Sequence, residues 1–372
     1  MYKFAVPTAC RDEIMSRKRV TITDVAKKAG VSIATVSRVI NDTDYHVNDE
    51  LRERVSQAAK ELQYMPNFFG RSLKNGKSKD IGVILPSMVN PFYSEVIAGI
   101  EKECRNAGYN PILCTSSNRP DKEKELIGLM QSKCVDGMLI STINDDSDFL
   151  RKLIGAETSI VIFDQPMPDF SGDSVTFDFY QAGMLSAQYL VDNGHSDIAF
   201  LSAPFERFSR RAVFRGFCDA LGKSEKTFSK KELFISAVKD YKKAGIDEFE
   251  NGRRLAKMFL NAHCAATAIV TINDITAFGI IQELIKNGCR VPEDVSVIGF
   301  DNISFSAMFS PSLTTISQPS FEMGRMAAQV LLERIRNRSK NSTQILMKPA
   351  IVERETVKKI GAASRKMKAE AE

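Results

Sequence analysis

The chain has 372 residues, enough for two or three domains, and its 43% hydrophobic and 26% charged residues exclude a disordered or fibrous protein. No apolar run reaches the ~18 residues that a membrane helix needs, and residues 1–14 lack the apolar core of a signal peptide. The net charge of +5 comes from residues 15–79, where 13 Lys and Arg against 7 Asp and Glu give +6, while the rest of the chain has a balance of −1.

Three short amphipathic helices are predicted in this basic N-terminal segment. Thr23 is a suitable N-cap for the first helix, and Gly30 ends it in a left-handed conformation. Ser32 caps a second helix, and a third runs from about Asn48 to Leu62. A helix, a three-residue turn with Gly and a second helix are the spacing of a helix-turn-helix. A compact basic module on a nearly neutral body is typical of a DNA-binding protein.

From residue 81 onward, short apolar runs alternate with amphipathic stretches. The runs predict strands at 81–85, 110–114, 137–140, 159–163, 198–202, 267–270 and 295–300. The stretches predict helices at about 92–107, 121–133, 178–193, 209–222, 248–261 and 274–287. Nearly continuous apolar strands with helices between them indicate a parallel sheet covered on both faces, and this segment is too long for one such sheet. We therefore predict two doubly wound lobes with a cleft between them.

Polar and aromatic residues follow several of these strands. Ligands of open α/β sheets bind beyond the carboxyl ends of the strands, so these residues are candidates for a ligand site. Amides and carboxyls exchange hydrogen bonds with a ligand, and aromatic rings offer flat apolar faces, which together suit a sugar ring. A turn or cap role is the alternative for Asp164 and Asn273. The candidates are Asn90, Phe92, Tyr93, Asp164, Asn273, Phe300, Asp301 and Gln318.

In the segment VTITDVAKKAGVSIATVSRVINDTDYHVNDELRERVSQAAKELQYMPN, the chain closely resembles the DNA-binding domain of the lac-repressor (LacI/GalR) family. The resemblance continues in NPFYSEVIAGIE, VDGMLI, NGHSDIAFL, NDITAFG, VPEDVSVIGFDN and LTTISQP, which covers nearly the full chain after Met15. It implies a dimeric, ligand-regulated transcription repressor with a core like a periplasmic binding protein. The expected parts are a disordered extension (1–14), a helix-turn-helix domain (15–65), a hinge helix and linker (66–80), a two-lobed effector-binding and dimerisation core (81–357) and a charged tail (358–372).

The resemblance also implies DNA contacts. The recognition helix 33–41 enters the major groove, where the Arg38 guanidinium bridges guanine O6 and N7. Ile33 and Ala34 read shape or a thymine methyl, and short polar side chains suit phosphates, with local capping as the alternative for two of them. The short polar side chains are those of Ser32, Thr35, Ser37 and Asn41. Local capping is the alternative role of Ser32 and Thr35. The segment NFFGRSL resembles the family's hinge helix, in which Leu73 is a minor-groove wedge and Asn67 and Arg71 are further contacts.

Two departures in the cleft bear on the effector. Sugar-binding relatives commonly carry arginines where this chain has Gln165 and Val213. Arg207, Arg210 and Arg211 crowd the start of the helix that carries Val213. We expect Arg210 to reach the vacated space, because it lies three residues before Val213 and side chains at that spacing are neighbours. We therefore expect an anionic effector, such as a sugar acid or sugar phosphate, held opposite Asp301. The alternative is that these arginines are solvated.

The motifs of common enzyme classes are missing from the sequence. No G-x-G-x-x-G, P-loop, H-E-x-x-H or G-x-S-x-G is present, and His195 is interpreted as a helix cap, so no catalytic residue is expected. The seven cysteines are scattered without a C-x-x-C pair, so we expect free thiols in a reducing cytoplasm, no metal and no cofactor. A periplasmic solute-binding protein would lack the basic module. A global carbon-catabolite regulator with a phosphorylated carrier protein as corepressor stays open. The C-terminal tail has no Leu heptad, so we expect a dimer that does not tetramerise.

Overall fold

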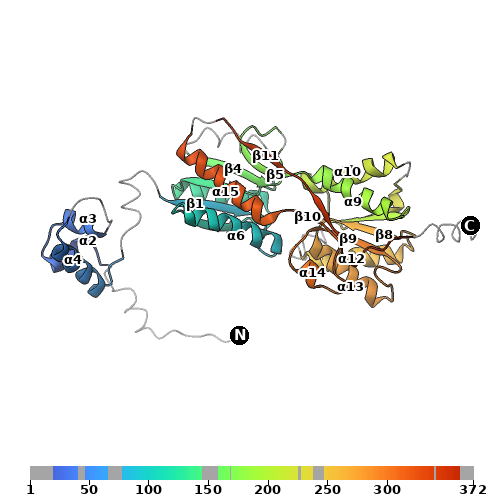
Figure 1. The fold of residues 1–372 in the computed structure, drawn as a ribbon, viewed down its shortest axis with the longest axis horizontal. Coiled ribbons are helices and arrows are strands. Elements are labelled where there is room, and N and C mark those ends of the chain that lie inside the picture. Colours follow the sequence, from blue (N-terminus) through green and yellow to red (C-terminus); the bar gives the residue numbers. More distant parts are fainter. Residues whose placement is uncertain are drawn as a thin grey trace, which may run out of the picture. The chain divides into compact units, whose positions relative to one another are not determined.

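The computed structural model describes residues 20–40, 47–65, 78–144, 158–167, 169–224, 228–237, 247–338 and 341–360. The chain separates into two compact units, Met1–Ser78 and Lys79–Glu372, both of which are drawn in Figure 1. Within the described residues, no helix is both long enough and apolar enough to cross a membrane.

The N-terminal unit contains α2 (Ile22–Ala29), α3 (Ile33–Ile40) and α4 (Asp49–Glu61). Val25, Val36 and Val55, one from each helix, are fully buried and form the centre of its core. The first helix begins two residues earlier than predicted. Its N-cap is Thr21 and not Thr23, because the Asp24 carboxylate accepts hydrogen bonds from both the backbone N–H and the hydroxyl of Thr21, at 2.8 and 2.7 Å.

The second unit contains two six-stranded sheets. The first sheet has the order β11-β5-β4-β3-β1-β2 and is entirely parallel. The second has the order β12-β10-β9-β8-β6-β7, and within it only β12 is antiparallel to its neighbour. The strands of the first are β1 (Asp80–Leu85), β2 (Asn110–Thr115), β3 (Gly137–Ile140), β4 (Ser159–Asp164), β5 (Asp173–Phe177) and β11 (Gln344–Met347). Those of the second are β6 (Ile198–Ser202), β7 (Leu233–Ile235), β8 (Ala268–Thr271), β9 (Ser296–Asp301), β10 (Thr315–Ser317) and β12 (Ala350–Val352).

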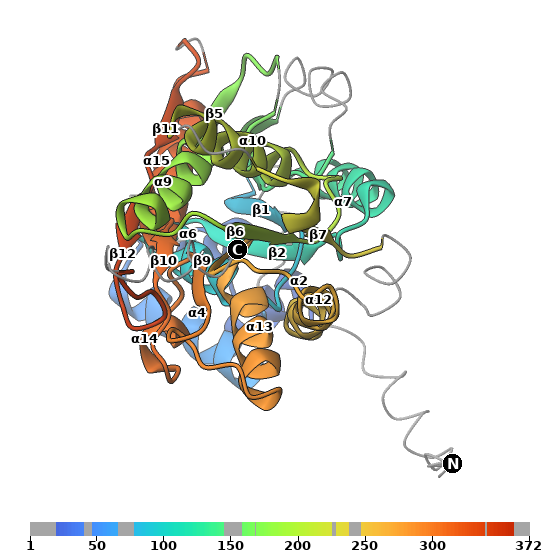
Figure 2. The ribbon, with the colours of Figure 1, turned by 90° about the vertical axis from the view of Figure 1, so that its right-hand side faces the viewer.

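Helices cover both faces of each sheet. The first lobe carries α6 (Pro91–Asn106), α7 (Pro120–Ser132) and α15 (Ser320–Arg336), and the second carries α9 (Phe179–Asp192), α10 (Phe208–Lys223), α12 (Glu248–Asn261), α13 (Asp274–Lys286) and the short α14 (Phe305–Met308). Alternate residues of β1 pack on opposite sides. Val83 belongs to the cluster around α6, whereas Ile84 packs with Ile127 and Met130 of α7. In the second lobe, α9 and α10 lie on one side of the sheet and α12 and α13 on the other (Figure 2).

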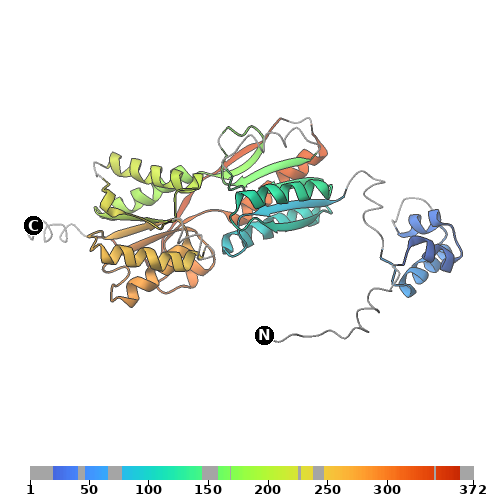
Figure 3. The same ribbon diagram turned by 180° about the vertical axis from the view of Figure 1, so that it is seen from behind.

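The predicted two-lobed α/β architecture is confirmed, and every predicted strand and helix of the core is present within one or two residues. The pattern missed β5, β7, β10, β11, β12, α14 and α15. The missed strands are short or contain polar residues, such as Asp173 in β5, so their hydrophobic signal is weak. The chain crosses between the lobes between β5 and α9, between β10 and α15, and between β11 and β12 (Figure 3).

The structure differs from the predictions in the role of His195 and in the end of the core. His195 is not a helix cap, because its ring is fully buried and its two nitrogens lie 2.9 Å from Thr267 Oγ1 and 3.1 Å from the Lys358 carbonyl oxygen. The packed core also continues past residue 357, since the Ile360 N–H donates to the Asn193 carbonyl at 2.8 Å. Residues 1–14 and the tail after residue 360 lie outside the described residues.

Candidate functional site

A cavity of about 110 Å³ lies between the two lobes of the core. Both lobes contribute to its wall. The lining residues of the first lobe are Ser87, Val89, Asn90, Phe92, Tyr93, Asn118, Asp164 and Gln165. Those of the second lobe and its connections are Phe179, Arg207, Ser209, Arg210, Asp247, Glu248, Ile272, Asn273, Ile275, Asp301 and Gln318.

The structure brings together nine of the ten cleft residues proposed from the sequence, and it leaves one out. Phe300 does not line the cavity. Its side chain is 1% exposed and belongs to the hydrophobic core, because successive side chains on a strand point to opposite faces and Asp301 takes the side toward the cavity. The most polar residues that the sequence analysis did not single out are Asn118, Asp247 and Glu248.

Asp164 is held at the end of β4 by a strained turn and a cluster of donors. Its φ of +65° lies in the left-handed region, which is costly for a residue other than glycine. Its Oδ2 accepts hydrogen bonds from Tyr93 Oη and Ser141 Oγ, both at 3.0 Å, and from Gln165 Nε2 at 3.3 Å. Burial raises the pKa of Asp164 above its usual range, although these donors oppose the shift.

Asp301 occupies the corresponding place after β9 in the second lobe. Its Oδ1 accepts a hydrogen bond from Gln318 Nε2 at 2.7 Å, and its Oδ2 accepts a longer one, at 3.4 Å, from Asn90 Nδ2 of the first lobe. Burial, followed by the neighbouring carboxylate of Asp274, raises the pKa of Asp301 well above its ordinary value. Gln318 Oε1 is buried and has no hydrogen-bond partner in the described part of the chain. A ligand donor would satisfy that oxygen.

Asn90 and Asn273 line the cavity and also cap helices. Asn90 Oδ1 accepts from the Phe92 N–H at the start of α6, and Asn273 Oδ1 accepts from the Thr276 N–H at the start of α13. The capping alternative is therefore correct for Asn273. Its Nδ2 donates to Glu248 Oε2, and burial raises the pKa of that carboxyl.

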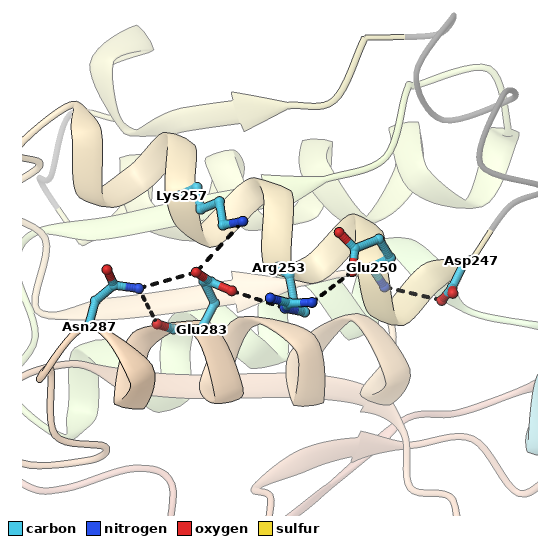
Figure 4. A network of polar contacts seen from close by, with 6 residues as sticks. All are labelled: Asp247, Glu250, Arg253, Lys257, Glu283 and Asn287. Atoms are coloured by element: carbon cyan, nitrogen blue, oxygen red, sulfur yellow. Dashed lines mark hydrogen bonds and ion pairs between the residues drawn. The ribbon is translucent and has the colours of Figure 1, made fainter.

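A chain of polar contacts fixes α12, whose first turn reaches the cavity, to α13 (Figure 4). Asp247 caps α12 by accepting from the Glu250 N–H at 3.1 Å. One turn on, Arg253 donates to Glu250 at 3.1 Å and to Glu283 of α13 at 3.0 Å. Lys257 lies 3.8 Å from the same Glu283 carboxylate. These contacts hold the acidic first turn of α12 against the cavity.

The Asp274 carboxylate, at the start of α13, joins this helix to the segments after β9. Its Oδ2 accepts from the Ile303 N–H at 3.0 Å and from Ser306 Oγ at 2.6 Å, and its Oδ1 accepts from Thr315 Oγ1 at 2.5 Å. Complete burial raises the pKa of Asp274 to about 7, against these hydrogen bonds.

The stability of the core is expected to decrease as the pH rises from about 5 to 8. The raised pKa values of Asp274 and Asp301 mean that the folded state keeps protons that the unfolded chain releases above about pH 4, and each unit of difference contributes about 1.4 kcal/mol. Carboxyls with lowered pKa values, such as Asp294, have finished titrating below pH 5. Urea unfolding of the wild type at pH 5 and pH 8 measures the slope, and Asp301→Asn should flatten it. A core that becomes more stable across this interval would contradict these assignments.

In the N-terminal unit, α3 exposes the side chains that the sequence analysis assigned to DNA. Val36 and Val39 face the core, whereas Ile33, Ala34 and Arg38 are exposed. Ser32 Oγ accepts from the Thr35 N–H at 3.1 Å and lies 2.9 Å from Thr35 Oγ1, so both hydroxyls make local capping contacts. Ser37 is half-buried on the same helix. Asn41, Asn67, Arg71 and Leu73, with nearly all of the proposed hinge, lie outside the described residues.

Two family models match the chain. Residues 21–67 match bacterial regulatory proteins of the lacI family, and residues 78–355 match periplasmic binding proteins and the sugar binding domain of the LacI family. Proteins called HTH-type transcriptional repressor PurR are similar over 342 residues: that of Mannheimia succiniciproducens is 37% identical and that of Vibrio parahaemolyticus 36% identical, each over 91% of this chain and 99% of the relative.

Solved structures of LacI-family proteins are also similar to this chain. The lac repressor dimer bound to operator and the anti-inducer ONPF is 26% identical with a TM-score of 0.78, over 92% of this chain and all of that one. A LacI-family regulator of Enterococcus faecium solved with bound ribose is 27% identical with a TM-score of 0.67, over 76% of this chain and all of that one. The chain therefore belongs to the LacI family and is a DNA-binding transcriptional repressor, not an enzyme.

Proposed function

We propose that this repressor binds a palindromic operator as a homodimer in the bacterial cytoplasm, and that a small effector in the interlobe cavity changes its affinity for that operator. The observation that carries the proposal is the cavity itself, because its polar wall comes from both lobes of one unit. A ligand that contacts both lobes favours one arrangement of them over others. Two-fold symmetry would then place two recognition helices one DNA turn apart.

The proposal assigns a role to each part of the chain. Residues 15–65 bind the operator half-site, residues 66–80 form the hinge, and residues 81–357 bind the effector and dimerise. On α3, Arg38 would read a guanine, Ile33 and Ala34 would contact base edges, and Ser37 would contact phosphate. The capping contacts of Ser32 and Thr35 leave these two residues a smaller share in DNA binding.

We infer further that the effector is neutral and about the size of one ring. The cavity, of about 110 Å³, is similar in scale to a cavity of about 150 Å³ that accommodates a benzene ring, so a compact ligand suits it better than an extended one. The similar regulator solved with ribose holds a ligand of the corresponding size. Neutral sugars and nucleobases both fit this description.

The charges of the cavity favour a neutral effector over the anionic one considered from the sequence. Arg207 and Arg210 do line it, but Arg210 Nη1 is engaged with the Pro204 carbonyl at 2.8 Å. Four carboxyl groups share the wall with the two guanidiniums, namely those of Asp164, Asp247, Glu248 and Asp301. The guanidiniums are already engaged with these carboxyls, because their positive charges act to lower the pKa values of Asp164 and Glu248, which leaves less of that charge for an anion. A hydroxyl or N–H of a neutral ring would donate to the carboxyl oxygens and to Gln318 Oε1.

A thermal-shift screen tests the effector class. The library contains neutral monosaccharides, sugar acids, sugar phosphates, and purine and pyrimidine bases. We expect stabilisation by a neutral sugar or a base, and calorimetry on Gln318→Met should show at least about tenfold weaker binding, because the buried amide is lost. Gln329→Met, on the exposed face of α15, is the matched control and should bind as the wild type does. Stabilisation by sugar acids or sugar phosphates alone, removed by Arg210→Ala, would contradict a neutral effector.

A further inference from the structure

A hydrogen bond spans the two lobes directly at the cavity. Arg207 Nη2, at the N-cap of α10 in the second lobe, donates to Asn118 Oδ1, which lies between β2 and α7 in the first lobe. Both residues line the cavity, and 89 positions separate them in the sequence. The bond is charge-assisted, and such bonds are roughly twice as strong as neutral ones. The other bond across the cleft described above, Asn90 to Asp301, is neutral on the donor side and long at 3.4 Å.

Asn118 is firmly attached to the first lobe. Its N–H donates to the Pro86 carbonyl at 2.9 Å, which ties the segment after β2 to the segment after β1. Ser117 and Asn118 both have positive φ, of 52° and 57°. Asparagine is among the residues that tolerate this left-handed conformation best. The turn therefore presents the Asn118 amide in a fixed position at the edge of the first sheet.

Arg207 is close to acidic groups of both lobes. Its positive charge acts to lower the pKa values of Asp164 and Glu123 in the first lobe and of Glu248 in the second. The guanidinium is therefore attracted to carboxyl groups on both sides of the cleft. A contact that exists only when the lobes are together stabilises the closed arrangement by its full free energy.

We propose that Asn118 and Arg207 form a clasp that holds the two lobes closed, with Asn118 as the residue that positions the Arg207 guanidinium over the effector. The part concerning the effector rests on the proposed function. The clasp itself does not require an effector, because both partners belong to the chain.

The absence of tryptophan from the sequence allows a clean test on the full-length protein. Phe208 of the second lobe and Thr142–Asn144 of the first surround a small cavity beside the clasp, so Phe208→Trp introduces a single reporter that closure buries. Acrylamide quenching of this tryptophan is measured without any ligand. Asn118→Gly tolerates positive φ but removes the amide, and Asn118→Asp gives Arg207 a carboxylate partner. Ser117→Gly is the control, because it changes the neighbouring residue of the same turn in the same way.

Asn118→Gly is expected to lower the ratio of closed to open protein by roughly five- to tenfold and to raise the quenching constant accordingly. Asn118→Asp should quench no more than the parent reporter, and Ser117→Gly should match the parent. Equal quenching in all four proteins would overturn the clasp, as would an equal increase in the two glycine variants. Because no effector is added, these results stand apart from the screen, and a screen without hits would count against the proposed effector only.

Discussion

Gly216→Ala is expected to destabilise the core by about 1–3 kcal/mol or more, because α9 and α10 meet backbone to backbone at this residue. A Cβ atom on Gly216 would lie 2.0 Å from the carbonyl oxygen of Tyr180, and the facing Gly183 stands in the same relation to the Val213 carbonyl. A carbonyl in a helix cannot rotate away, so the two helices would have to separate. The cavity residues at the start of α10 would move with them.

Gly128→Ala on α7 is the matched control. A Cβ atom there meets nothing within 4 Å, so the alanine should stabilise the protein by up to about 1 kcal/mol through its higher helix propensity. Urea unfolding of the two variants beside the wild type should therefore shift the midpoints in opposite directions. A Gly216→Ala protein as stable as the wild type would show that the helices are not in the close contact described above.

Arg38→Ala is expected to reduce binding to the preferred operator about 10- to 100-fold while leaving non-specific DNA binding nearly unchanged. A bidentate arginine–guanine pair contributes about 1–3 kcal/mol of discrimination, whereas non-specific affinity comes from many phosphate contacts. Arg38 is exposed on α3 while Val36 and Val39 anchor the helix in the core, so the substitution should not unfold the unit.

Arg54→Ala removes the same charge from the exposed side of α4 and serves as the control. Competition binding with the preferred operator and a scrambled duplex, at one salt concentration, separates the two effects. Both variants should keep nearly the non-specific affinity of the wild type, and only Arg38→Ala should lose preference for the operator guanine. If Arg38→Ala retained that preference, the assignment of Arg38 to a base would be wrong.

The parts of the fold that sequence patterns predicted are those with strong periodicity. Buried parallel strands such as β4 consist almost wholly of apolar residues, and α12 was predicted at its observed bounds. By contrast, β5 begins with Asp173, whose carboxylate accepts a hydrogen bond from Arg334 Nε of α15 at 2.6 Å. This polar residue of the strand is therefore paired by a tertiary contact that no local pattern reveals. Neither β5 nor α15, the two elements that this hydrogen bond joins, was predicted from the sequence.

The candidate site was predicted where residues directly follow strands, as Asp164 and Asp301 do. Glu248 and Asp247 were missed although their helix was predicted. Their place at the cavity depends on the packing of α12 against α13 through Gly252, where a Cβ atom would lie 2.2 Å from the Thr276 carbonyl. Asn118 was missed for a similar reason, since its partner Arg207 is remote in the sequence. Phe300 was included wrongly because adjacency to Asp301 says nothing about which face of the strand it occupies.

Sequence-specific recognition of a symmetric DNA site by this chain can be tested directly by selecting bound duplexes from a random-sequence library with the full-length protein and sequencing the enriched pool. We expect enrichment of one palindromic motif, with a guanine in each half-site whose enrichment disappears with Arg38→Ala. An enriched pool with no common motif, or with a motif lacking two-fold symmetry, would contradict it.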